Sequence, residues 1–223
     1  LHKQYTLEKF KEGHTGKNFT AQEPKFNFKK PVFKKKIDLP KASEVEVARK
    51  YLENRKLNPN QFYYAHKFKE WTNNQKKTFS NTFNDEGRII IPLYDFDNTL
   101  IGFQGRSLNR NSIKYISVML IDEAPKIYGL NTVNAKLPIY VVEGPFDSTF
   151  IDNSVALCGS DGDVCCLEGS DLIFVYDNEP RNQEIVRRIG DTIDRGNKVV
   201  IWPTNIKEKD INDLVLSGHD VMN

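Results

Sequence analysis

Apolar and polar positions divide the chain into a polar stretch, a helix-and-hairpin region and a region of alternating strands and helices. Apolar residues recur at helical spacing after Ser43, and Ser43-x-x-Glu46 has the spacing of a capping box. We expect this helix to end near Leu57, before Asn58-Pro59. A second short helix is expected over residues 62–68. Both helices are interpreted as scaffold.

A β-hairpin is predicted over residues 88–108. Its strands are expected at 89–94 and 100–106, joined by a turn at 95–98 that is rich in turn-forming residues. Pro92 cannot donate a ladder hydrogen bond, so it indicates an edge position or a bulge.

From residue 139 onward, short apolar runs alternate with amphipathic stretches. Such alternation predicts an α/β fold with a parallel sheet and right-handed crossovers. Strands are expected at 139–142, 154–158, 172–176 and 198–202, and helices at 146–151 and 182–195, with Gly196 ending the last helix.

Charge follows the same division. Residues 1–137 hold 25 Lys and Arg against 14 Asp and Glu, whereas residues 138–223 hold 7 against 16. A basic half suits a polyanion such as nucleic acid, and an acidic half can concentrate metal ions. We therefore predict a basic arm or linker at 1–41, a basic subdomain at 42–137 and a catalytic domain at 138–223. Residues 24–36 interleave phenylalanines with lysines and are interpreted as part of an extended arm.

Several classes of protein are disfavoured. No apolar run reaches transmembrane length and no signal-peptide pattern opens the chain, so we expect a cytoplasmic protein without a membrane partner. Cys158, Cys165 and Cys166 lack Cys-x-x-Cys spacing, which argues against a disulfide framework and against zinc in this chain. Leu1 in place of methionine leads us to expect a fragment or a processed chain.

Acidic residues follow successive apolar runs in the second half. The carboxyl ends of parallel strands form the crevice where open α/β sheets bind ligands. Carboxylate oxygens are the ligands that hard divalent cations prefer, so this crevice is predicted to hold such ions. Gly144, directly after Glu143, is expected to let the backbone turn tightly. The acidic residues are Glu143, Asp147, Asp177, Glu179, Asp210 and Asp213.

These residues resemble the three motifs of the Toprim domain, which occurs in bacterial-type primases, topoisomerases and some nucleases. The upstream sequence resembles the basic subdomain that precedes Toprim in bacterial and phage DNA primases. The resemblance covers the chain from about Ala42 to its end, and residues 177–182 are most similar to primases of T-even-type phages. The matching stretches are Glu143-Gly144 with Asp147, Asp177-x-Glu179, Lys209-Asp210, and upstream residues 48–62, 87–108, 114–115 and 125–130.

The resemblance implies a DNA primase catalytic core in which a Toprim domain follows a smaller basic α+β subdomain. Such an enzyme is a nucleotidyltransferase that makes short RNA primers from ribonucleoside triphosphates on single-stranded DNA, with a replicative hexameric helicase as partner. It implies two or more Mg²⁺ or Mn²⁺ ions, with Asp177, Glu179 and Asp210 as metal ligands, Glu143 as ligand or general base, and Asp147 as a supporting group. Template or triphosphate contacts are implied for Arg88, Arg106, Lys114, Tyr115 and Lys126.

Two departures from the family pattern leave alternatives open. Glu179 stands where the second motif usually has aspartate, and Asn212 stands where the third motif usually has its second aspartate. Asn212 or the adjacent Asp213 could assist at the metal site. A Toprim nuclease and a catalytically inactive nucleic-acid-binding module remain the alternative functions. The zinc-binding domain expected at a primase amino terminus is missing from this sequence, either because it was removed or because the protein never had one.

Overall fold

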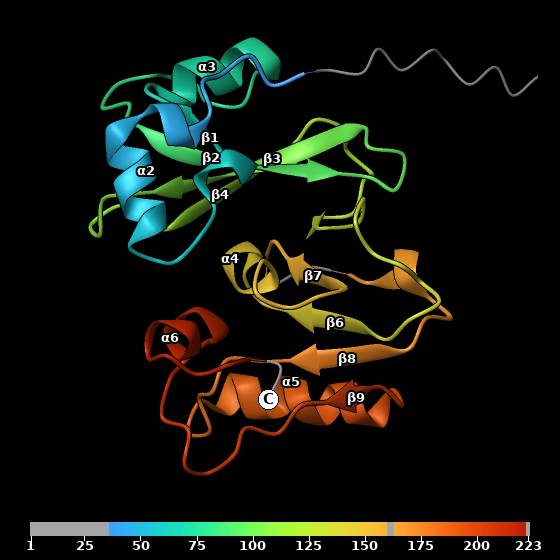
Figure 1. The fold of residues 1–223 in the computed structure, drawn as a ribbon. Helices are drawn as coiled ribbons and strands as arrows, with labels where there is room; N and C mark the ends of the chain where they lie inside the picture. The colour runs from blue at the N-terminus through green and yellow to red at the C-terminus, as the bar shows by residue number, and fades with distance from the viewer. Residues whose placement is uncertain (1–35, 160–162, 222–223) are drawn as a thin grey trace, which may run out of the picture. The chain divides into compact units, whose positions relative to one another are not determined.

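The protein was analysed as a computed structural model, which describes residues 36–159 and 163–221 (Figure 1). These residues form a four-stranded and a five-stranded sheet, each with helices packed against it. Residues 1–35 of the predicted arm lie outside the described part, so the arm stays a prediction. Within the described ranges, every helix is too short or too polar to cross a bilayer.

The first sheet is antiparallel and has the strand order β1-β2-β3-β4. The predicted hairpin is confirmed as β2 and β3, and the Asp95 carboxylate fixes its turn by accepting hydrogen bonds from the amides of Asp97 and Thr99. Pro92 lies beyond the part of β2 that pairs with β1, next to a register shift at Leu93/Tyr94, as a proline requires. The strands are β1 (Tyr63–Ala65), β2 (Arg88–Tyr94), β3 (Leu100–Ser107) and β4 (Tyr115–Met119).

Both helix predictions near the start of this region were wrong in detail. The predicted capping box does not form, because Ser43 lies in a 3₁₀ turn (Ala42–Glu44) and α2 (Glu46–Glu53) begins after Val45 without a side-chain cap. The Ala42 amide instead donates to the Phe62 carbonyl. The predicted second helix is replaced by β1, since its aromatic residues pair with β2; the helix α3 (Phe68–Gln75) starts where the prediction ended.

The second sheet has the order β5-β7-β6-β8-β9, and all pairs are parallel except β5 with β7. The four predicted strands are confirmed, although β9 is shorter than expected, and β4 and β5 were not foreseen. The strands are β5 (Ile127–Tyr128), β6 (Ile139–Val142), β7 (Ser154–Leu157), β8 (Leu172–Val175) and β9 (Lys198–Val199), and a 3₁₀ turn (Cys165–Leu167) precedes β8.

Three helices accompany this sheet: α4 (Pro145–Ser148), α5 (Gln183–Asp194) and α6 (Ile211–Leu216). The Asn182 side chain caps α5 by accepting from the Glu184 amide. Gly196 ends this helix at φ +81°, the left-handed conformation that favours glycine. The predicted helix over 182–195 is confirmed, whereas the one over 146–151 ends early, at Ser148.

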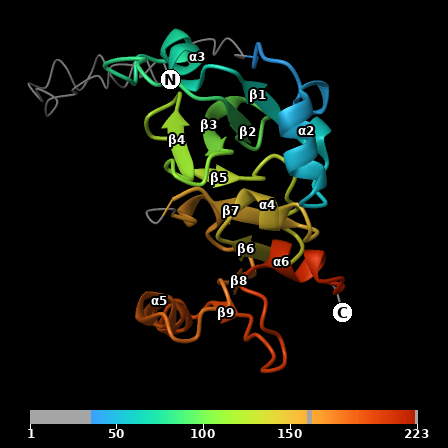
Figure 2. The same cartoon turned by 90° about the vertical axis from the view of Figure 1, so that its left-hand side faces the viewer.

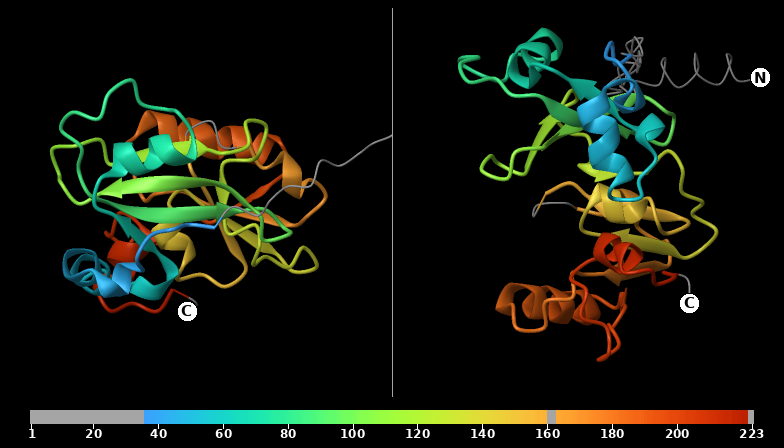
Figure 3. Two further views of the ribbon diagram at one scale, coloured as in Figure 1. Left: turned by 90° about the horizontal axis from the view of Figure 1, so that it is seen from above. Right: turned by 60° about the vertical axis from the view of Figure 1, so that its left-hand side comes forward.

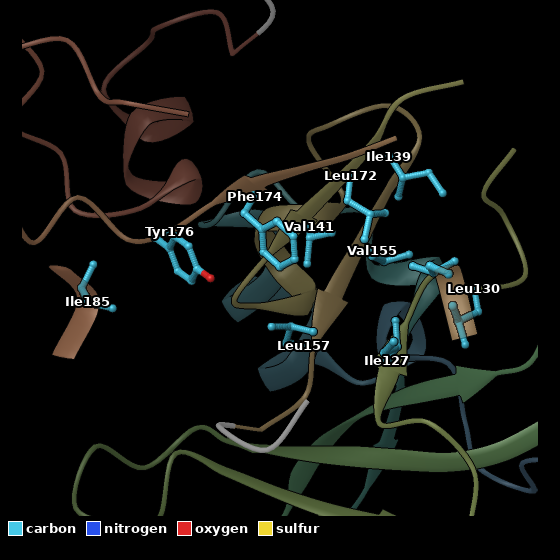
Figure 4. Packing of buried hydrophobic residues seen from close by; sticks show 11 residues of the cluster. Ile127, Leu130, Ile139, Val141, Val155, Leu157, Leu172, Phe174, Tyr176 and Ile185 are labelled. Carbon is cyan, nitrogen blue, oxygen red and sulfur yellow. The ribbon is translucent and has the colours of Figure 1, made fainter. Parts of the chain in front are cut away.

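Helices cover both faces of each sheet. In the second sheet, α5 packs on one face, where Ile185 joins the apolar cluster shown in Figure 4, while Ile211 of α6 packs on the opposite face (Figure 2). In the first sheet, α2 and α3 take opposite faces, with Leu52 and Phe68 as their buried anchors (Figure 3). Burial of this apolar surface is the main force that orders the strand ends on which the site is built.

One apolar cluster contains residues from both predicted subdomains. Phe146 of α4 packs edge-to-face on Phe62, with ring centroids 5.4 Å apart, and joins the cluster formed by α2 and β2. Strand β5 lies before residue 137 in the chain but pairs with β7 of the second sheet. The boundary at 137/138 stays a prediction, and β5 argues for moving it upstream.

Candidate active site

Four of the predicted acidic residues line one cavity of about 190 Å³. Glu143 follows β6, Asp147 lies in α4, Asp177 follows β8, and Asp210 caps α6. They converge because β6 and β8 are adjacent parallel strands whose carboxyl ends meet at one edge of the sheet. Basic and aromatic residues complete the lining: Arg55, Arg106, Lys114, Tyr115 and Phe146.

Gly144 leaves space for the Asp147 side chain rather than forming a tight turn. Its φ of −116° is open to any residue, so the expectation of a special turn was wrong. A Cβ atom at this position would lie 2.6 Å from Oδ2 of Asp147. Glycine therefore allows the Asp147 carboxylate to approach the backbone that follows β6.

Burial and neighbouring carboxylates raise the pKa of three acidic residues in this cavity. Burial, and after it the charge of Asp210, raises the pKa of Asp147 to about 7. Burial and the charge of Asp177 likewise raise the pKa of Glu143. Burial also raises the pKa of Asp177, although Lys209 at 3.7 Å opposes the shift. A cation in this cavity would relieve the repulsion.

Asp147→Asn should therefore stabilise the protein when divalent ions are absent. Because the folded-state pKa lies above the unfolded value of about 3.9, the folded state binds more protons, and stability falls as pH rises from about 4 to 7. The variant keeps an acceptor for the Asn212 amide, which donates to Asp147 Oδ1 at 2.9 Å, and removes the charge.

The measurement is urea unfolding in EDTA between pH 5 and 8. At pH 8 the free energy of unfolding of the variant should exceed that of the parent protein by on the order of 3 kcal/mol, and this difference should shrink toward pH 5. Asp152→Asn, a substitution of an exposed carboxylate in the same segment, serves as control. A gain that is independent of pH, or that the control shares, would contradict the raised pKa of Asp147.

Asn212 connects the third acidic motif to the first half of the chain. It is 2% exposed, and its Oδ1 accepts from Arg55 Nη1 at 2.7 Å while its Nδ2 donates to the Arg55 carbonyl at 2.8 Å. Its backbone amide holds Asp147. Both side-chain groups of Asn212 thus already have partners within the protein, and the choice between Asn212 and Asp213 as the assisting residue stays a prediction.

Placing the family's usual aspartate at this position should lower the free energy of unfolding. In Asn212→Asp a carboxylate oxygen would face the Arg55 carbonyl, so one buried hydrogen bond is lost at a cost of ~1–3 kcal/mol. Urea unfolding at pH 7 measures the loss, and Asn205→Asp provides the same charge change at an exposed site. Equal stability of both variants would show that the bond to the Arg55 carbonyl contributes nothing.

Two predicted metal ligands do not line the cavity. Glu179 has its side chain one-third exposed, pairs with Lys209 Nζ at 2.9 Å and accepts from Asn182. The hydrogen bond from Lys209 lowers the pKa of Glu179. Asp213 is exposed, and its backbone amide donates to Asp210 Oδ1 at 2.8 Å. The metal-binding roles of both residues stay predictions.

Arg106 brings a buried positive charge to the cavity. It is 8% exposed, and its Nε and Nη2 donate to the Tyr51 hydroxyl at 3.0 and 2.8 Å. Its Nη1 is buried and has no hydrogen-bond partner among the described residues. A buried guanidinium with an unused donor is costly unless an anion compensates it, so this residue suits a phosphate.

Tyr115 and Lys114 lie beside Arg106. The Arg106 guanidinium is 4.7 Å from the centre of the Tyr115 ring, and burial raises the pKa of the Tyr115 hydroxyl to about 12. The ring also meets Phe146 edge-on, so packing within the protein already uses much of its surface. Lys114 is exposed and lines this cavity and the neighbouring basic pocket of about 260 Å³.

Arg88 does not fit the nucleic-acid role predicted for it. It is 3% exposed, and its guanidinium donates to the carbonyls of Gly105 and Ile113 and to the Glu86 carboxylate. These bonds make it a structural link within the first sheet. Lys126 precedes β5, and its carbonyl accepts from the Cys158 amide; it does not line the cavity.

Sequence reasoning missed Arg55, Tyr51 and Arg188. Arg188 Nη1 donates to Glu143 Oε1 at 3.0 Å, and Arg55 lines the cavity directly. Arg55 contacts Asn212 across 157 positions of sequence, so no local spacing could reveal it.

Divalent ions fit the residues of this cavity. Within the described ranges, no three His, Cys, Asp or Glu side chains are arranged closely enough to define a preformed metal site. The donor set nevertheless consists of carboxylate oxygens, the ligands that Mg²⁺ and Mn²⁺ prefer, and burial with neighbouring carboxylates raises the pKa of Glu143, Asp147 and Asp177.

Comparison with known proteins identifies relatives of this chain. No family model matches the chain. The DNA primase of Enterobacteria phage T4 is 32% identical over 227 residues, an alignment that covers 96% of this chain and 66% of that protein. The chain belongs to the DNA primase family. The chain spans about two thirds of the length of the T4 protein.

Solved structures show the same fold for this member of the primase family. The RNA polymerase domain of Mycobacterium tuberculosis primase DnaG has a TM-score of 0.61 at 19% identity, covering 80% of this chain and 74% of that one. A DnaG primase catalytic domain bound to ssDNA has a TM-score of 0.57 at 20% identity, covering 80% and 71%. The α/β fold expected from the Toprim resemblance is confirmed.

Proposed function

We propose that the chain is the catalytic core of a DNA primase, which joins ribonucleotides into short RNA primers on single-stranded DNA during replication. One observation carries the proposal: a single cavity joins four carboxylates to a buried arginine whose Nη1 has no hydrogen-bond partner among the described residues. Metal-dependent phosphoryl chemistry needs this pair of features side by side. The T4 relative and the DNA-bound DnaG domain support the choice of reaction.

We assign metal binding to the acidic residues of the cavity and phosphate binding to its buried arginine. Glu143, Asp177 and Asp210 would hold Mg²⁺ or Mn²⁺, with Glu179 reaching in from the rim of the cavity if Lys209 releases it. When bound, such ions supply activation of the 3′-hydroxyl and neutralisation of the leaving pyrophosphate. Arg106 would bind a phosphate of the nucleotide or template. Asp147, held by the Asn212 amide, keeps the first and third motifs together.

The test is primer synthesis. The protein is incubated with single-stranded DNA, the four ribonucleoside triphosphates and Mg²⁺ or Mn²⁺, and RNA products are separated by length. Short RNA that depends on template and metal supports the proposal. Cleavage of the template without RNA synthesis would favour a Toprim nuclease, and binding without either reaction would favour an inactive module. A hexameric helicase is the proposed partner, and its addition should raise primer yield.

DNA binding should depend strongly on salt. Lys114 is exposed at the cavity and is proposed to contact a template phosphate. Lys114→Ala should then reduce the slope of log affinity against log salt by about one, since one counter-ion fewer is released. Fluorescence anisotropy with a labelled oligonucleotide measures the slope. Lys198→Ala, which removes an exposed lysine of β9 paired with Asp171, is the control. An unchanged slope in Lys114→Ala would remove this residue from the DNA contact.

A further inference from the structure

Arg188 contacts Glu143 from a cavity other than the one that the remaining carboxylates line. A second cavity, of about 350 Å³, is lined by Gln104, Ser117, Glu143 and Arg188 among others. Glu143 lines both cavities, whereas Arg188 lines this second cavity and not the one that contains Asp177 and Asp210. Glu143 therefore forms part of the wall between them.

The position of Arg188 is fixed by its own surroundings. Its guanidinium is 4.9 Å from the centre of the Tyr176 ring, and the Tyr176 hydroxyl is 2.6 Å from Thr192 Oγ1, one turn further along α5. Trp202 Nε1 donates to the Tyr176 carbonyl at 2.8 Å. Tyr176 is thus held at its hydroxyl and at its backbone carbonyl, directly before Asp177, and its ring gives the guanidinium a fixed platform.

A neighbouring arginine shows what an ordinary surface ion pair on this helix looks like. Arg187 has its side chain 70% exposed and lies 3.7 Å from Asp191. The side chains of Arg188 and Glu143 are only 23% and 26% exposed, and their charged atoms are 3.0 Å apart. The second pair is shorter, more buried and connected to the candidate site.

We propose that Arg188 is a positioning residue, which holds Oε1 of Glu143 and so turns Oε2 toward the cavity of Asp147, Asp177 and Asp210. Within the described ranges, Oε2 makes no hydrogen bond, so it is left for a metal ion or for the attacking hydroxyl. The proposal rests on the proposed function in taking Glu143 as a group of the reaction. Arg188 itself would touch neither metal nor substrate.

The kinetic test compares Arg188→Ala, Arg188→Lys and the control Arg187→Ala. Loss of a group that orients a metal ligand typically costs ~10–100-fold in activity or metal affinity. We expect Arg188→Ala to lower kcat for primer synthesis by this amount with little change in KM for nucleotides. Arg188→Lys should recover part of kcat, since it keeps the charge but not the planar contact with Tyr176. Arg187→Ala should match the parent protein.

A second measurement does not depend on synthesis. Fe²⁺ replaces the catalytic ion, and ascorbate with peroxide then generates radicals that cut the backbone beside the bound iron. The parent protein should be cut near residues 143, 177 and 210, whereas Arg188→Ala should lose the cut near 143 by ~10-fold or more and keep the other two. Arg187→Ala should give the parent pattern. Cutting without any primer synthesis by the parent protein would refute the proposed function and leave the role of Arg188 intact.

Four outcomes would overturn the role of Arg188. Two concern the cutting: Arg188→Ala gives the parent cutting pattern, or the parent protein shows no cut near residue 143. The third is a kcat loss accompanied by a lowered Tm that Arg187→Ala does not show. The fourth is a rise in KM for nucleotides at unchanged kcat, which would mean that Arg188 contacts substrate.

Discussion

Asp177→Asn should abolish primer synthesis while the protein stays folded. The cavity places this carboxylate where β8 ends, beside Glu143 on the adjacent strand. Removing one charged metal ligand withdraws several kcal/mol from the transition state, and each 1.36 kcal/mol is tenfold in rate, so a loss of ~10³-fold or more is expected. Burial raises the pKa of Asp177, so its charge opposes folding and the neutral amide should not lower stability.

The other end of the same strand offers a matched control. Asp171 precedes β8, is exposed and pairs with Lys198 at 2.8 Å. Asp171→Asn makes the same chemical change about one strand length from the cavity. Single-turnover primer extension at saturating Mg²⁺, combined with thermal melting, compares the two variants. Substantial synthesis by Asp177→Asn would remove this residue from the metal site.

Arg106→Gln should produce the second-largest loss of primer synthesis. The arginine is the buried cation of the cavity, and removing one preorganised donor from a developing phosphate charge typically costs ~10²–10³-fold in kcat. The effect should appear at saturating nucleotide, with weaker binding of single-stranded DNA in addition. Arg106→Lys should restore little, because an ammonium cannot donate to the Tyr51 hydroxyl and to a phosphate in the same planar arrangement.

Stability must be measured together with activity for this variant. Arg106→Gln also weakens the contact with Tyr51, so the free energy of unfolding is expected to fall by ~1–3 kcal/mol. Assays are therefore run well below the Tm of the variant. Arg49→Gln removes an exposed arginine of α2 that lies 3.5 Å from Glu53, and it should leave both quantities unchanged. Full activity of Arg106→Gln at a temperature where it is folded would exclude a role for Arg106 in the reaction.

Strands could be predicted from the sequence where a continuous apolar run marks them. Apolar runs such as 139–142 and 172–175 stand out because strands buried on both faces need apolar side chains throughout. The short strands β1 and β5 carry few residues, and pairing with distant partners decides them. The capping box at Ser43 failed for the same reason, since the chain before α2 bonds to residues 62–63 instead.

The carboxylates were easier to predict than the residues that position them. Glu143, Asp147, Asp177 and Asp210 come at or shortly after predicted strand and loop ends, and topology then brings them together. Arg88 was misjudged because a surface cation and a buried one look alike in sequence. The roles of Arg55, Asn212 and Arg188 depend on contacts between segments far apart in the chain, which one sequence does not show.

Phe146 has a consequence for any attempt to use the acidic half as an independent module. It lies between Glu143 and Asp147 in sequence, yet its ring is only 3% exposed in a cluster built by α2 and β2. An excised fragment starting at residue 138 would present this ring to water and would leave β7 without β5 along one edge. Apolar surface beside an open strand edge favours self-association. The acidic residues of the candidate site would thus be carried on a fragment inclined to aggregate, and grafting this half onto another protein would require the partner surface of α2 as well.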